Sequence, residues 1–263
     1  MNSQKNTQTR GIISSALTLL FLISFGTLVF TSVGCNKDTQ QPKSQPTDTV
    51  NNEVNLAILP DRTEGSQLTD LIDPTGVLKN MGVNGNLGET DVYGTVFLTP
   101  INANSLNEVK EFSLNPPGGF NETRYQRNNV VNNFRSKLEI ELNKLNALPA
   151  GANNTSIWRP FCDMVNHMSK KSGTKKIILA SDMMENFITS FYRYDFSKKD
   201  DFDDAVRKLN KEIQCPNITG FEIIIVYKPT SVPDDIRFRA ATDLFWRPYL
   251  ESLGARVSIR GNL

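Results

Sequence analysis

The residues Val54–Leu59 form an apolar run with one polar interruption, Asn55, and the run breaks at Pro60. An apolar run of this length, bounded by turn-forming residues, is typical of a buried β-strand. The following residues, Gln67–Met81, repeat their apolar side chains at helical spacing, which predicts a helix. The polar segment Asp61–Ser66 therefore joins a buried strand to a helix. In open α/β sheets, ligands bind at the carboxyl ends of the strands.

The composition excludes several kinds of site. The 263 residues carry a formal net charge of +1 and a single histidine, His167. One histidine disfavours His-centred acid–base catalysis and nearly excludes a multi-histidine zinc site. No basic run stands out, so nucleic acid is not an expected partner. Carboxylates and hydroxyls remain, and these suit hard cations such as Mg²⁺, Mn²⁺ or Ca²⁺.

The N-terminal segment has the pattern of a targeting sequence. Lys5 and Arg10 precede residues 11–34, which carry no charged side chain. Such a run is either a secretory leader or an anchor helix, since about 20 apolar residues span a bilayer. The residues Ser32-Val33-Gly34-Cys35 resemble a bacterial lipoprotein signal. The resemblance implies that residues 1–34 are removed, that Cys35 is lipidated, and that the protein is anchored in the cell envelope, with the outer membrane favoured. The alternative is an uncleaved anchor.

Two further regions follow the leader. Residues 35–53 are almost entirely polar and rich in Asn, Gln, Thr and Pro. Such a composition cannot bury a core, so a disordered tether is expected there. Residues 54–263 have the length and apolar content of a single folded domain.

The remaining elements alternate between strand and helix patterns. Further strands are predicted at residues 91–99, 108–114, 175–180, 221–227 and 255–260, and further helices at residues 121–145, 155–171, 200–213 and 234–253. Pro160 fits only the first turn of its helix, and Pro248 should kink or split the last one. The short link after residue 99 indicates an antiparallel pair, and residues 255–260 alternate like an edge strand. The order predicts an α/β fold: a doubly wound, mostly parallel six-stranded sheet with one antiparallel strand and helices on both faces.

Oxygen-bearing side chains gather at three junctions: Asp61 with Thr63 and Ser66, then Thr155, then Asp182 after the strand 175–180. The first and third junctions are expected on neighbouring central strands, so their side chains can converge. Two carboxylates with hydroxyls and water would form an octahedral site for Mg²⁺ or Mn²⁺, and Ca²⁺ is not excluded. Ser, Thr and Asp are also the preferred N-caps of helices, which is the competing explanation for each loop.

Over residues 54–260 the chain resembles the von Willebrand factor type A domain, both in the order of its elements and in motif. The resemblance implies a metal-ion-dependent adhesion site of the Asp-x-Ser-x-Ser type. Asp61 and Thr63 match the first two ligands, Thr155 matches the later Thr, and Asp182 matches the late Asp. Gly65 stands at the second Ser position, and Ser66 follows it.

The resemblance also implies recognition without turnover. The metal would keep one position open for a carboxylate of a protein partner, and no catalytic residue is expected. The residues expected around such a site are Arg62, Glu64, Met183, Met184 and Phe187.

Two other functions remain open at this stage. Gly65 favours a metal-free scaffold of an envelope complex, because a metal site needs its full oxygen shell. The strand followed by Asp61-x-Thr63 is also similar to metal-dependent phosphohydrolases with an aspartyl nucleophile, although those need a second acid where Thr63 stands. Cys162 and Cys215 are expected either as a disulfide or as buried free thiols.

Overall fold

The computed structural model describes residues 52–61, 71–101, 109–147 and 155–263. The predicted leader, Cys35 and nearly all of the predicted tether lie outside these residues. Within the described ranges, no helix combines the length and the apolar character that a membrane crossing requires.

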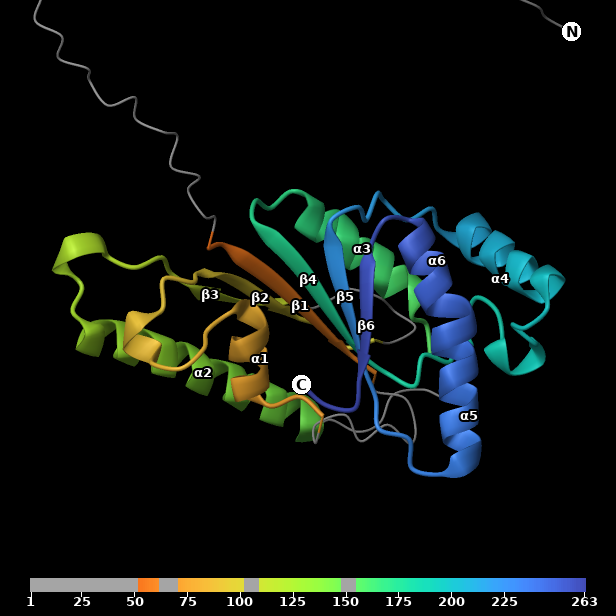
Figure 1. Cartoon of the computed structure of the whole chain (residues 1–263), viewed down its shortest axis with the longest axis horizontal. Coiled ribbons are helices and arrows are strands. Elements are labelled where there is room, and N and C mark those ends of the chain that lie inside the picture. The colour runs from red at the N-terminus through yellow and green to blue at the C-terminus, as the bar shows by residue number, and fades with distance from the viewer. Residues whose placement is uncertain (1–51, 62–70, 102–108, 148–154) are drawn as a thin grey trace, which may run out of the picture. The chain divides into compact units, whose positions relative to one another are not determined.

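A single six-stranded sheet organises the described residues (Figure 1). The strand order is β3-β2-β1-β4-β5-β6, and only the β2–β3 pair is antiparallel. The strands are β1 (Val54–Pro60), β2 (Gly94–Leu98), β3 (Lys110–Leu114), β4 (Thr174–Ala180), β5 (Phe221–Val226) and β6 (Arg256–Arg260). This confirms the predicted α/β fold with a mostly parallel sheet, one antiparallel strand, and β6 at an edge.

Strand β1 lies at the centre of the sheet, and all seven of its residues are buried. Its apolar side chains alternate between two cores: Leu56 and Ile58 belong to one, and Ala57 and Leu59 to the other. Asn55, the one polar residue of the run, is buried and donates a 2.7 Å hydrogen bond to the carbonyl of Ser172. A strand covered on both faces reads as a continuous apolar run, which explains the sequence pattern.

The helices cover both faces of the sheet (Figure 1). Helices α1 (Pro74–Met81) and α2 (Arg124–Ala147) pack on one face, and α3 (Trp158–Ser169), α4 (Lys199–Glu212), α5 (Val232–Ala241) and α6 (Arg247–Ser252) pack on the other. The described residues also form three short 3₁₀ turns: η1 (Leu87–Glu89), η2 (Gly119–Asn121) and η3 (Phe191–Arg193).

Helix α1 is shorter than the predicted helix over residues 67–81. It begins at Pro74, because the Asp73 side chain accepts hydrogen bonds from the amides of Thr75 and Gly76 and acts as the N-cap. Proline at the first helical position needs no amide partner, which reinforces this start. Leu71 and Ile72 are buried outside the helix, so their spacing reflects core contact in irregular backbone.

The predicted helix over residues 234–253 is interrupted, as Pro248 suggested. Helix α5 passes into a π-helical turn, η4 (Thr242–Trp246), and then into α6, where Pro248 lies in the first turn. Because Pro248 has no amide hydrogen to donate to the preceding turn, the helical hydrogen bonds are irregular just before it. Pro160 likewise lies in the first turn of α3.

A disulfide joins Cys162 on α3 to Cys215 in the segment before β5, with 4.8 Å between the Cα atoms. Of the two alternatives for these cysteines, the structure has the bonded one. The same two segments are also held by a 3.0 Å hydrogen bond from Trp158 Nε1 to the carbonyl of Ile213. The N-terminal part of α3 is thus fixed to the connection between α4 and β5.

Candidate functional site

The carboxyl ends of β1 and β4 lie side by side, since Pro60 pairs with Ala180 in the parallel ladder. The amide of Asp61 extends this pairing with a 2.9 Å hydrogen bond to the carbonyl of Ala180. The Ser181 hydroxyl donates a 2.8 Å hydrogen bond to Oδ2 of Asp61, and both residues are buried. The predicted convergence of the first and third junctions is therefore present in the fold.

Asp182 is the second carboxylate of this edge. Its Oδ1 accepts a 2.9 Å hydrogen bond from the amide of Met184. Burial raises the pKa of Asp182 to about 6, and the negative charge of Asp61 contributes to the increase. The two acids thus interact electrostatically in a poorly solvated position, where both cannot ionise without cost.

Thr155, from the second junction, lies against the loop that follows Asp182. Its carbonyl accepts a 2.9 Å hydrogen bond from the amide of Asn186, and the residue is buried. The neighbouring Ser156 hydroxyl is also buried, and it has no hydrogen-bond partner among the described residues. Buried polar groups nearly always have a hydrogen-bond partner, so this hydroxyl is one of the exceptions among the described residues.

Glu185 is the main feature of the site region that the sequence reasoning missed. Its carboxylate is fully buried and accepts four backbone hydrogen bonds. Oε2 accepts from the amides of Ile157 (2.7 Å) and Trp158 (3.1 Å), and Oε1 accepts from those of Phe187 (2.9 Å) and Ile188 (3.0 Å). Burial raises the pKa of Glu185, while the amide donors oppose that rise.

Glu185 therefore serves the start of α3 as a cap supplied from a distant loop. A carboxylate suits this position because the first amides of a helix are unsatisfied and carry partial positive charge. The signal available in the sequence was a lone acid within the apolar loop of residues 183–188.

The predicted rim is only partly at the surface. Met183 and Met184 lie in the core, at 0% and 6% exposure, whereas Phe187 is 46% exposed. Met183 also has a left-handed backbone with φ 63°, which turns the chain inward directly after Asp182. The expectation of a methionine rim is thus corrected, because long apolar side chains gain more from burial. Arg62, Thr63, Glu64 and Ser66 lie outside the described residues.

Helix α5 places further charged groups near this edge of the sheet. The Tyr227 hydroxyl donates to the Asp234 carboxylate at 2.9 Å and 3.1 Å. Asp234 raises the pKa of Asp182 and Arg237 lowers it, so both residues face the same edge of the sheet. The charges of Asp61, Asp182, Asp234 and Arg237 also act on Tyr192. Its pKa is raised mainly by partial burial and then by the charge of Asp182.

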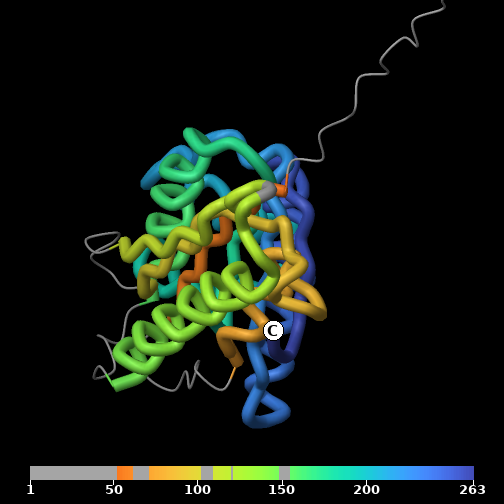
Figure 2. The backbone as a smooth tube through the Cα atoms, turned by 90° about the vertical axis from the view of Figure 1, so that its left-hand side faces the viewer, coloured from red at the N-terminus to blue at the C-terminus, as the bar shows by residue number. Residues whose placement is uncertain are grey.

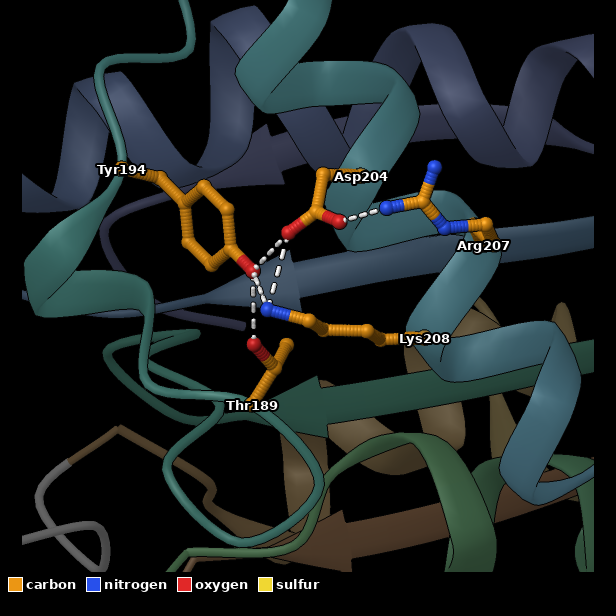
Figure 3. Close-up of polar contacts among 5 residues, drawn as sticks. All are labelled: Thr189, Tyr194, Asp204, Arg207 and Lys208. Atoms are coloured by element: carbon orange, nitrogen blue, oxygen red, sulfur yellow. Dashed lines mark hydrogen bonds and ion pairs between the residues drawn. The ribbon is translucent and has the colours of Figure 1, made fainter.

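A separate polar network fixes the far end of the loop to α4 (Figure 3). The Tyr194 hydroxyl donates to Asp204 at 2.7 Å, receives a hydrogen bond from Lys208 at 2.7 Å, and lies 2.9 Å from the Thr189 hydroxyl. Asp204 also pairs with Arg207 through its other oxygen. Because these groups satisfy one another, the network anchors the loop, and it does not enter the proposed site.

A hard divalent cation at this sheet edge would be held by oxygen donors. Asp61, Asp182 and the Ser181 hydroxyl lie at the ends of β1 and β4, and Thr155 and Ser156 lie on the segment that is hydrogen-bonded to the loop after Asp182. The described ranges contain no group of three or more His, Cys, Asp or Glu side chains able to hold a metal by themselves. A cation here would therefore need hydroxyl and water oxygens to complete its shell, as Mg²⁺ commonly does.

Comparison with known proteins identifies no family. No family model matches the chain, and no curated protein matches it. Among solved structures, proximal thread matrix protein 1 (PTMP1) from the mussel byssus is similar at a TM-score of 0.32 and 12% identity, over 79% of this chain and 44% of that chain. The chain spans less than half of that protein's length, and a likeness this weak carries no argument about function.

Proposed function

We propose that this chain is a lipid-anchored protein of the bacterial cell envelope whose α/β domain binds a protein partner through a divalent cation. The domain is of the von Willebrand factor A type in this proposal, and its lipid is carried on Cys35. Asp61, Asp182 and Thr155 hold the cation, together with Thr63 and Ser66 from the segment outside the described residues. Mg²⁺ or Mn²⁺ is the expected ion.

The observation that carries the proposal is that two carboxylates, Asp61 and Asp182, follow the carboxyl ends of the adjacent strands β1 and β4 and interact electrostatically. Burial, with a smaller contribution from repulsion by the charge of Asp61, raises the pKa of Asp182 to about 6. A bound cation removes this repulsion, so it stabilises the fold wherever both acids are ionised. The bound cation would supply an open coordination position for a partner carboxylate.

The disulfide supports the proposed location. Structural disulfides persist in oxidising compartments such as the bacterial periplasm and the cell surface, and are rare in the cytosol. The Cys162–Cys215 bond is therefore consistent with a domain that lies outside the cytoplasm.

The metal is tested on residues 49–263, which form one compact unit. Mn²⁺ or Mg²⁺ should raise the melting temperature, by the equivalent of about 2.7 kcal/mol at a hundredfold excess over Kd. Asp61→Ala should abolish this response. The matched control is Asp203→Ala on the exposed surface of α4, which should keep it. An equal response in Asp61→Ala would place the metal elsewhere.

The partner's chemistry is tested with Mn²⁺ as the reporter. An aspartate-containing peptide should change the electron paramagnetic resonance spectrum of protein-bound Mn²⁺, since a carboxylate replaces a coordinated water. The same peptide with asparagine in place of aspartate should leave the spectrum unchanged. Metal binding without any response to the aspartate peptide would overturn the partner half of the proposal.

The alternative is a metal-free scaffold of an envelope complex. It is favoured by the hydrogen bonds that Ser181 and Met184 already donate to the two carboxylates. A melting curve that ignores millimolar Mg²⁺, Mn²⁺ and Ca²⁺ would support this alternative. A phosphohydrolase is a weaker alternative, because Thr63 stands where a second acid is needed. Hydrolysis of generic phosphate esters, lost in Asp61→Ala, would favour it.

A further inference from the structure

The sheet has two edge strands, β3 and β6. A groove lies at the β3 edge, between this strand and helix α2. It contains a hollow of about 290 Å³. Phe112 of β3 lines it together with Val130 and Phe134 of α2, and Asn133 and Lys137 lie along its helix side. Figure 2 looks at this side of the molecule, where α2 runs across the view. The groove takes no part in the function proposed above.

One wall of the groove is the edge of the strand itself. Glu111 and Ser113 line the hollow although strand alternation puts their side chains on the other face from Phe112. The Glu111 carboxylate confirms that placement, because it lies 3.2 Å from Nε2 of His167 on α3. Glu111 and Ser113 therefore line the hollow with their backbone atoms. Within the described residues β3 pairs only with β2, so its outer amides and carbonyls form a template for another strand.

The helix side of the groove supplies specificity. Lys137 is exposed, and it forms no ion pair with any described residue. One turn further along α2, Ile140 is 53% exposed. An apolar floor beside a lysine that forms no ion pair with the described residues suits a ligand that presents one apolar and one acidic side chain. On an extended chain, side chains two residues apart point to the same face.

We propose that β3 and α2 form a docking site for an extended segment of another protein, which pairs with the outer edge of β3. The segment places an apolar side chain in the hollow over Phe112 and an acidic side chain against Lys137. Peptides bind edge strands in this way when main-chain hydrogen bonds supply affinity and pockets for alternate side chains supply specificity.

The test selects ligands from a displayed library of random peptides of about ten residues on the full chain in detergent micelles. Selected peptides should carry an acidic residue two positions from an apolar one. Asn133→Trp, which fills the groove from an exposed helix position, and Lys137→Glu should each weaken their binding at least about tenfold. The matched controls, Ser136→Trp and Arg135→Glu, lie on the same helix but do not line the hollow. They should stay within about twofold of the wild type.

Hydrogen exchange locates the bound peptide. The amides of residues 110–114 should gain protection on binding, and those of residues 256–260 should not. The proposal is overturned if no peptide is enriched, if the groove variants bind as the controls do, or if protection appears on β6. A dimer of the chain that Lys137→Glu dissociates would also overturn it, because a second copy would then occupy the groove.

Discussion

The indole Nε1 of Trp246 donates a 2.8 Å hydrogen bond to the carbonyl of Met183, the residue directly after Asp182. Met183 holds a left-handed backbone, which costs a residue with a side chain roughly 1–2 kcal/mol. Trp246 ends the π-helical turn, and such turns are frequent at functional sites. The irregular helix therefore supplies the group that holds the strained residue in place.

We expect Trp246→Phe to destabilise the fold by roughly 1–3 kcal/mol, because the buried carbonyl of Met183 loses its donor and a small cavity forms. The variant should also weaken the proposed metal response, since Asp182 loses its fixed neighbour. Tyr249→Phe serves as control, because it removes the hydrogen bond to Asn210 in the same aromatic cluster without touching Met183. Urea titrations with and without Mn²⁺ measure both effects. An equal metal response in the two variants would contradict the positioning role.

Asp182→Asn should stabilise the metal-free domain at neutral pH. The folded-state pKa of Asp182 is raised to about 6, so ionisation of this group opposes folding above that pH. At neutral pH the gain should approach about 2–3 kcal/mol, and it should shrink as the pH falls through 6 and vanish near pH 4. Asparagine keeps an oxygen for the amide of Met184. Melting curves in EDTA at pH 7.5 and pH 4 test this, and destabilisation at pH 7.5 would refute it.

Glu185→Ala should be among the most damaging single substitutions. It leaves the four backbone amides at the start of α3 and in the loop without acceptors in a buried place, at a cost of roughly 3–5 kcal/mol. Glu185→Gln retains one acceptor oxygen, so its free energy of unfolding should lie between those of the wild type and Glu185→Ala. Chemical denaturation ranks the three proteins. A loss below about 1 kcal/mol for Glu185→Ala would show that water replaces the carboxylate.

Breaking the disulfide should lower stability by about 4 kcal/mol, given the sequence separation of 53 between its cysteines. The paired variant Cys162→Ala/Cys215→Ala and the wild type in reducing agent should behave alike in urea. Thiol counting on denatured, unreduced residues 49–263 gives the direct check. Two free thiols would exclude the bond in the isolated protein.

Processing at Cys35 remains a prediction from the sequence. Mass spectrometry of the membrane fraction should find an acylated Cys35 as the mature N-terminus. The variant Cys35→Ala should lose this processing and its membrane attachment. An intact Met1, or unchanged processing in the variant, would contradict the lipoprotein assignment.

The strands could be predicted from the sequence because burial on a sheet produces a local pattern of apolar residues. Runs such as Val54–Leu59 and Phe221–Tyr227 follow from burial on both faces, and all six predicted strands are present with ends shifted by a few residues. Helix starts were harder. Apolar spacing placed the start of α1 too early, since Leu71 and Ile72 reach the core without being helical.

Within the site, the convergence of Asp61 with Ser181 and Asp182 followed from strand order. What could not be predicted depends on how one loop folds inward. Met183 and Met184 turn into the core through a left-handed residue, and Glu185 caps a helix that begins 27 residues earlier in the chain at Trp158. Neither feature leaves a periodic signal, because each depends on contacts between distant segments.

The hydrogen bond between Ser181 and Asp61 joins residues 120 positions apart in the chain. During synthesis the N-terminal part of the chain appears first, so Asp61 is present long before β4, the strand that must lie beside it. Closing so long a loop is entropically costly and slow compared with forming local helices. If the proposed site binds a cation, its ligands come together only when β1 and β4 pair, unlike the local ligand set of a zinc finger. We therefore expect metal supply to affect how long the finished protein survives more than how fast it folds.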